Sequence, residues 1–413
     1  MRGQRTAALL GATAMVVALG ACGNGSNTAG SASKVPVTIT FQEQFNDAQT
    51  AAIKKLVPKF EAANPGIKVV LNRDNDAGYY DKLVTQITAG KGPDVVRVDP
   101  AKAPQYIASG WALPLGDAVG KPSEYFPAAL DAVTKDGGLY GVPLDVEALA
   151  LFYRTDVLAA AGYDKPPATW AEFSAMAKAL TKNGKHGVAL FGGWGAFEFY
   201  PWLWQAGAEV LSADNKKAVF NSPEAVSALQ MWVDLQASAM PPGMATAAED
   251  DVKGPFVSGS VAMFTSGPWT IPALQKAGID GKWAVAPMPG GKNQATVLGG
   301  MDLLVLKNSK HAQEAKTFLS WLMKDENIKQ YYVEIGGLPA KVALFDDPAF
   351  AADPYVSQFK AILKQARSRP AVAASNDVDA ALGKAVQAAL AGTQSPKQAL
   401  DTAVAKANSA LGG

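Results

Sequence analysis

Apolar and polar positions alternate along the chain between two spacings. Short runs rich in β-branched residues predict strands at 35–41, 67–71 and 94–98. Between them, apolar residues recur at helical spacing and predict helices around 53–60 and at 79–89. Because strands that alternate with helices favour parallel pairing, this part of the chain predicts an α/β sheet.

Two later helices have marked starts. Thr169 and Glu172 have the spacing of a capping box, in which each side chain satisfies a backbone N–H of the first turn. Ser222 stands before Pro223, which is the order of an N-cap and a proline at the first helical position. These signals predict helices that begin near 170 and 223.

Prolines and glycines predict where other helices bend or end. Pro58 lies inside the first helical pattern, so we expect a kink or a restart there, and the pattern should end at 64–66. The C-terminal region 377–411 is rich in alanine, with apolar residues at helical spacing. It predicts two helices divided at 392–396.

The chain begins with the layout of a secretory signal peptide. Arg2 and Arg5 precede an uncharged stretch, 6–21, that is too short for a confident membrane span. We therefore expect residues 1–21 to be a signal peptide. No later run reaches the roughly 20 apolar residues that a spanning helix needs.

The only cysteine directly follows this stretch. Residues 19–22, Leu-Gly-Ala-Cys, resemble the bacterial lipobox, in which the cysteine receives a lipid and becomes the new N-terminus. The resemblance implies a lipid on Cys22, which leaves no thiol for a disulfide, a metal or catalysis. Residues 23–33 are small and polar without periodicity, so 22–34 should be a lipidated flexible tether.

Length and charge narrow the classes of protein. Without residues 1–21 the chain of 413 residues keeps 392, which exceeds the usual size of a single core and indicates two domains. The formal net charge is +1. Such a balance provides no basic field for nucleic acid, so we expect no nucleic-acid partner.

Several stretches, in order, resemble a known family. They are 60–69, 92–96, 106–115, 138–143, 147–158, 256–263 with 267–269, and 336–340. Together they resemble the extracellular solute-binding proteins of ATP-driven carbohydrate importers, the group typified by maltodextrin-binding protein.

This resemblance implies an α/β protein with the two-lobed, type II periplasmic-binding-protein-like fold. Two three-layer lobes would be joined by a hinge, with the ligand cleft between them. Lobe 1 would comprise 35–145 plus 300–337, and lobe 2 would comprise 146–299 plus 338–413. Crossings between the lobes are expected near Asp145, Gly299 and Gly337.

Aromatic rings can stack on the apolar faces of a sugar, so tryptophans are candidate ligand contacts. Trp269, in Gly-Pro-Trp, matches the family position whose tryptophan stacks on sugar. Trp194 lies among glycines that let a ring project from a loop, and it is equally well explained as a hydrophobic loop anchor. The remaining tryptophans are expected mostly in the core.

Polar candidates are the side chains that follow strands or lie near the crossings. Glu147 aligns with a carboxylate that lines the cleft in the family. Glu43 and Asn46 follow the first strand and Asp99 the third, where α/β folds place ligand groups, although each could simply cap a helix. The last two candidates are Asp302 and Arg369.

The resemblance implies a substrate-binding lipoprotein of an ABC importer, which captures a mono- or oligosaccharide and delivers it to the permease. The protein would be a monomer on the extracellular face of a Gram-positive or actinobacterial type of cell membrane, with no cofactor, no metal and no enzymatic activity. Residues 41–45 lack the lysine-bearing loop of maltodextrin binders, and 198–200 align poorly with them. These two differences count against maltodextrin as the particular ligand.

Two alternatives remain open. A secreted glycoside hydrolase needs two carboxyl groups beside the scissile bond, and Glu147 with Asp302 or Asp99 could supply them by number. No local motif supports this, and two histidines make a catalytic triad or a histidine-rich zinc site a poor explanation. The other alternative is a binder of a different polar solute, such as a glycerol phosphate derivative.

Overall fold

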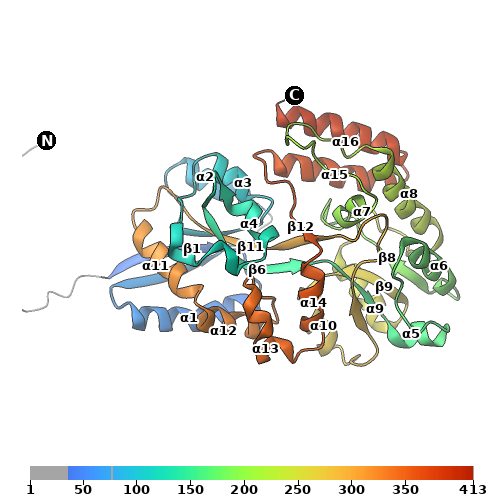
Figure 1. Ribbon diagram of the computed structural model, residues 1–413, viewed down its shortest axis with the longest axis horizontal. Helices are drawn as coiled ribbons and strands as arrows, with labels where there is room; N and C mark the ends of the chain where they lie inside the picture. Colours follow the sequence, from blue (N-terminus) through green and yellow to red (C-terminus); the bar gives the residue numbers. More distant parts are fainter. Residues whose placement is uncertain (1–35, 76–77, 413) are drawn as a thin grey trace, which may run out of the picture. The chain divides into compact units, whose positions relative to one another are not determined.

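The computed structural model describes residues 36–75 and 78–412. The predicted signal peptide, Cys22 and the tether lie outside these residues, so those expectations stay predictions. Among the helices that the structure describes, none combines the length and apolar character needed to cross a bilayer. Two larger sheets organise the described chain (Figure 1).

The first sheet lies mainly in lobe 1 and runs in the order β12-β11-β3-β1-β2, with β6 also paired to β11. Its strands are β1 (Val37–Glu43), β2 (Ile67–Arg73), β3 (Val95–Val98), β6 (Gly141–Ala148), β11 (Thr296–Val305) and β12 (Ala366–Arg367). The predicted parallel pairing is confirmed, because β1 pairs in parallel with both β2 and β3. β11 runs antiparallel to β3 and β6.

Helices cover both faces of this sheet. They are α1 (Asp47–Ala63), α2 (Tyr79–Thr88), α3 (Ala103–Ala108), α4 (Pro127–Leu130), α11 (Ala312–Leu322) and α12 (Asp325–Ile335), with the hairpin β4 (Thr134–Lys135) and β5 (Gly138–Leu139). Figure 1 shows α1 and α12 on one side and α2 and α3 on the other. Phe318 contacts the rings of Phe41 and Phe60 at 6.0 and 5.1 Å, which places α11 in the core.

The second sheet forms the centre of lobe 2. Its order is β10-β7-β9-β8, with β10 (Ala284–Ala286), β7 (Ala150–Tyr153), β9 (Val261–Ser266) and β8 (His186–Ala189). The helices in the part of the chain predicted to form lobe 2 are α5 (Thr155–Ala160), α6 (Trp170–Leu180), α7 (Tyr200–Gln205), α8 (Pro223–Ser238), α9 (Glu249–Ser258), α10 (Ile271–Lys276), α13 (Pro348–Ala351), α14 (Val356–Leu363), α15 (Ser375–Leu390) and α16 (Pro396–Leu411). The predicted caps at Thr169 and Ser222 and the division of the C-terminal region are confirmed.

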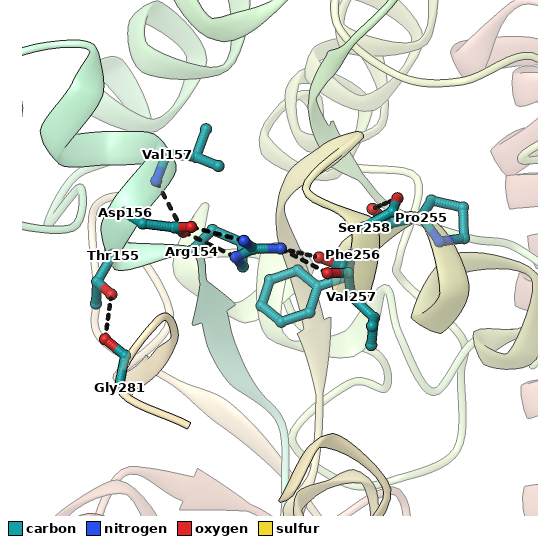
Figure 2. A network of polar contacts seen from close by, with 9 residues as sticks. All are labelled: Arg154, Thr155, Asp156, Val157, Pro255, Phe256, Val257, Ser258 and Gly281. Atoms are coloured by element: carbon teal, nitrogen blue, oxygen red, sulfur yellow. Dashed lines mark hydrogen bonds and ion pairs between the residues drawn. The ribbon is translucent and has the colours of Figure 1, made fainter. Parts of the chain in front are cut away.

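Arg154 fixes the end of α9 against the start of α5 (Figure 2). Its Nη1 donates to the carbonyl oxygens of Phe256 and Val257, both at 2.8 Å. Nε and Nη2 donate to the two carboxylate oxygens of Asp156 at 2.8 and 2.7 Å. The last carbonyl groups of a helix lack hydrogen-bond donors within the helix. Because the buried Arg154 guanidinium donates to two of them, it anchors the end of α9.

β6 and β11 run side by side between the two lobes. Glu147 lies opposite Gly299 and Asp145 opposite Met301, and a β-bulge follows at Met301 and Asp302. A third segment joins them, because Val146 forms a bridge with Leu338. The three segments at which crossings are predicted are therefore neighbours in the structure.

Of the two outcomes predicted at Pro58, a kink or a restart, the restart does not occur. α1 continues through Pro58 without a restart, since Pro58 is exposed and the carbonyl that it leaves unpaired can reach water.

The ring of Phe345 packs on the ring of Phe126, with their centres 5.6 Å apart, so a segment predicted for lobe 2 also contacts lobe 1. The lobe limits themselves stay a prediction.

Candidate ligand-binding site

Both aromatic and polar side chains that were predicted to contact the ligand line one pocket of about 480 Å³. Residues of both lobes and of the crossing strands line it. They are Gln44, Tyr80, Asp99, Ala101, Lys102, Glu147, Trp194, Phe197, Trp269, Gly299, Gly300, Met301, Arg369, Asn376 and Asp379. Five of the eight predicted contacts are thus brought together.

Three rings of lobe 2 form an aromatic wall, which consists of Trp194, Phe197 and Trp269. The Trp269 ring lies 5.8 Å from Trp194 and 6.3 Å from Phe197, in tilted arrangements. Trp194 is 37% exposed although it is a large apolar side chain, so part of its ring is accessible at the pocket. The wall therefore offers apolar ring faces to a ligand.

Asp99 and Arg369 come from different lobes and pair with each other. Arg369 Nη2 lies 2.5 Å from Asp99 Oδ1, and the guanidinium lies over the Phe197 ring at 5.3 Å. Burial lowers the pKa of Arg369, but Asp99 and Asp379 raise it more, so the net shift is upward. Both predicted residues line the pocket, and together they connect the lobes.

Lys102 and Asn376 form a second connection between the lobes. Lys102 Nζ donates to Asn376 Oδ1 at 2.8 Å and lies 4.9 Å from the centre of the Tyr80 ring. Asn376 in turn donates to Gln105 Oε1 at 2.9 Å. The amine and the amide thus reach the pocket with fixed orientations.

Glu147 lies at the crossing strands, where glycines leave room beside it. A Cβ on Gly299 would lie only 3.1 Å from the Phe197 ring, so the bare backbone keeps this part of the pocket open. Burial, followed by repulsion from Asp145, raises the pKa of Glu147 to about 8. The raised pKa favours the protonated form of Glu147, which can donate a hydrogen bond.

Asp379 adds a carboxyl group from the first turns of α15. Burial raises its pKa, while the neighbouring Arg369 opposes that change. Tyr200, which is fully buried behind it, hydrogen-bonds to it. The pocket therefore combines carboxyl groups, amides and cations around its aromatic wall.

Three predicted contacts lie outside the pocket. Glu43 is buried and accepts a hydrogen bond from the Phe45 backbone, and Asn46 caps α1 by accepting from Gln49 at 2.9 Å. Asp302 lies in β11 between β3 and β6 and is 1% exposed. Asn46 therefore has the capping role that was its alternative explanation, whereas Glu43 is the last residue of β1 and accepts from the turn that leads into α1.

The described residues 36–75 and 78–412 contain no cluster of three or more histidine, cysteine or acidic side chains arranged to hold a metal ion. Two of the carboxyl groups of the pocket have other partners: Asp99 pairs with Arg369 and accepts from the backbone N–H of Ala101, and Asp379 hydrogen-bonds to Tyr200.

The sequence of the chain matches a family model over residues 46–329, described as bacterial extracellular solute-binding protein. The chain belongs to this family. Members of the family are binding proteins of ABC transporters rather than enzymes.

Relatives of the solute-binding family resemble the chain over nearly all of its length. The galactooligosaccharide-binding protein of Bacillus subtilis is 26% identical over 408 residues, which cover 94% of this chain and 93% of that protein. A solute-binding protein of Thermotoga lettingae, solved with α-D-tagatose, matches with a TM-score of 0.80 and 27% identity over 91% of this chain and 100% of the other. The GacH receptor of Streptomyces glaucescens, solved unliganded and with acarbose, matches with a TM-score of 0.82 and 26% identity over 91% and 99%.

These likenesses confirm the predicted fold class, the two-lobed type II fold of solute-binding proteins. Sequence reasoning nevertheless missed several residues that line the pocket of this family member. They are Gln44, Tyr80, Lys102, Phe197, Asn376 and Asp379. Gln44 directly follows β1, as Asp99 directly follows β3, so the same strand-end rule could have found it.

Proposed function

We propose that this chain is the carbohydrate-binding component of an ABC importer, and that a neutral mono- or oligosaccharide binds in the pocket between its lobes. The observation that carries the proposal is the aromatic wall of Trp194, Phe197 and Trp269 in one pocket with carboxyl and amide side chains. A sugar has apolar C–H faces and a rim of hydroxyl groups, which need these two kinds of partner.

The named relatives support the class of ligand. One is a galactooligosaccharide-binding protein, and two matched structures were solved with α-D-tagatose and with acarbose. Carboxyl groups accept hydrogen bonds from hydroxyls when ionised, and Glu147 can donate one when neutral. The pocket can thus satisfy both the donors and the acceptors of a polyol rim.

The proposal extends to the setting of the protein. A lipid on Cys22 would hold a monomer on the extracellular face of the membrane, and the 22–34 tether would let it reach the permease. Metabolic labelling with an alkyne fatty acid tests this part. Label should enter the wild-type protein and be lost in Cys22→Ala.

Calorimetry tests the ligand class. Residues 23–413 are titrated with a panel of neutral mono- and disaccharides, and with glycerol phosphate as the competing solute class. One-to-one binding of a saccharide supports the proposal. Binding of glycerol phosphate alone would replace it with the polar-solute alternative.

Product analysis separates binding from hydrolysis. If the protein released monosaccharide from oligosaccharides with turnover, the hydrolase alternative would stand. The hydrolase alternative needs Asp302 or Asp99 as the second carboxyl group beside Glu147. Asp302 lies outside the pocket, and Asp99 is paired with Arg369. This arrangement supports binding rather than hydrolysis.

A further inference from the structure

The Trp269 indole is held by its backbone as well as by its neighbours. Trp269 lies in the short 3₁₀ turn η4 (Pro268–Thr270), directly after β9. A Cβ on Gly267 would lie 1.9 Å from a carbon of the indole ring, so the ring folds back over the bare glycine. This close approach limits the rotamers available to Trp269, but it leaves the tilt of the ring to be set by polar contacts.

Glu249 supplies the polar contact of the indole. It is the first residue of α9 and is 2% exposed. Its Oε2 accepts from Trp269 Nε1 at 2.7 Å, and its Oε1 accepts from Ser266 Oγ at 2.9 Å. Because both oxygens are engaged, the carboxylate cannot rotate without breaking one of these bonds.

The helix that carries Glu249 is itself anchored. At its other end, Arg154 binds the carbonyl oxygens of Phe256 and Val257 (Figure 2). A carboxylate in the first turn of a helix is also favoured by the helix dipole. Glu249 is therefore a fixed acceptor rather than a mobile surface acid, although it is not among the residues that line the pocket.

We infer that Glu249 is the positioning residue of the aromatic wall: its carboxylate fixes the tilt of the Trp269 indole, and through it the affinity for a ring-shaped solute. The affinity part of this inference rests on the proposed function. The orientation part does not, because it concerns one hydrogen bond inside lobe 2.

The chain offers a matched control. Glu198 is also fully buried, and its Oε2 accepts from Thr265 Oγ1 at 2.6 Å, one residue before Ser266. It makes no hydrogen bond to Trp269 among the described contacts and does not line the pocket. Glu198→Gln therefore shows how far the removal of a nearby buried acid disturbs the fold of lobe 2 when the hydrogen bond to Trp269 is kept.

The first measurement needs no ligand. In protein labelled with ¹⁵N-tryptophan, the nine indole N–H signals are recorded, and the signal absent in Trp269→Phe is assigned to Trp269. We expect Glu249→Ala to shift and broaden this signal, and Glu249→Gln, whose amide oxygen can still accept, to shift it less. Glu198→Gln should leave it in place. An unmoved Trp269 signal in Glu249→Ala overturns the inference.

The second measurement uses maltose, galactose and tagatose as probes of affinity. With any probe that binds, Glu249→Ala should weaken binding about 10-fold in the wild-type background and have almost no effect in the Trp269→Ala background. If Glu249→Ala weakens binding equally in both backgrounds, Glu249 does not act through Trp269. If neither these probes nor any other saccharide of the calorimetry panel binds to wild type, the proposed function has failed, and the indole signals still decide the positioning role.

Discussion

At the scale of residues, the pocket joins two kinds of side chain that a soluble protein rarely exposes together. A tryptophan that is 37% exposed lies in the same pocket as the partly buried ion pair of Asp99 and Arg369. Exposed aromatic area is costly in water, and buried charge must be paired. Their coexistence here is what the proposed ligand would require, since a saccharide can cover the rings and hydrogen-bond to the polar groups.

Removal of the Trp269 ring tests the aromatic wall. Trp269→Ala should weaken saccharide binding by about 1–3 kcal/mol, because it deletes the stacking surface of the ring. Titration calorimetry of the variant beside the wild type measures the change. An unchanged affinity would place Trp269 in the core instead of at the ligand.

Glu147 should make stability depend on pH. Its pKa rises from 4.5 to about 8 on folding, so between these values the folded state holds more protons than the unfolded state. The free energy of unfolding must then fall as pH rises through this window, by at most about 1.4 kcal/mol per pH unit for one proton.

Glu147→Gln removes this titration, so urea unfolding from pH 5 to pH 8 should show a shallower decline in the variant. A decline as steep as that of the wild type would mean that other carboxyl groups, such as Asp302, carry the whole dependence.

Asp99, chosen because it follows a strand, and Glu147 and Trp269, chosen from stretches that resemble the family, all line the pocket. The same strand-end rule also selected Glu43 and Asn46, which lie outside the pocket, so position after a strand does not by itself identify a lining residue. Asp379 could not be found in this way, because it lies in an alanine-rich helix whose apolar pattern indicates only packing. Its position at the pocket depends on how α15 meets lobe 1.

At the scale of elements, the crossing strands β6 and β11 determine where the pocket opens. Gly300 has φ of +114°, which side chains rarely allow, and a Cβ there would lie 2.3 Å from the carbonyl oxygen of Asp145. The two strands therefore approach closely only because this position lacks a side chain.

Gly300→Ala should destabilise the protein by about 1–3 kcal/mol, since the backbone must shift away from its strained conformation. The midpoint of urea unfolding measures this loss. Gly66→Ala is the matched control, because a Cβ at that exposed turn would meet nothing within 4 Å. Equal midpoints for the two variants would contradict the close approach.

Most elements were predictable from local pattern. The β-branched runs, the capping box at Thr169 and the break before α16 all hold, because each depends on residues a few positions apart. The continuity of α1 through Pro58 was not predictable, since it depends on which face of the helix reaches solvent. The long strand β11 also escaped prediction, as its partners come from three distant segments.

At the scale of the whole molecule, contacts between α15 and the start of α3 connect the lobes beside the pocket. Ser375 is 3% exposed and donates through Oγ to the carbonyl oxygen of Ala101 at 2.5 Å. A typical hydrogen bond adds about 0.5–1.5 kcal/mol. This contact should therefore favour the arrangement of the lobes described above over a more open one.

Ser375→Ala should lengthen the mean distance between the lobes in ligand-free protein. Spin labels at Lys54→Cys and Lys165→Cys, both exposed and on different lobes, report this distance by pulsed electron resonance in a Cys22→Ser background. The same distance distribution in the variant would show that the contact does not bias closure.

The central claim is that the pocket lined by Trp269, Asp99 and Glu147 binds a neutral saccharide. Its most direct test is titration calorimetry of residues 23–413 with the saccharide panel, repeated with Trp269→Ala. We expect saturable one-to-one binding of at least one saccharide, weakened at least several-fold by the substitution. The absence of binding to every saccharide, together with binding of glycerol phosphate, would contradict it.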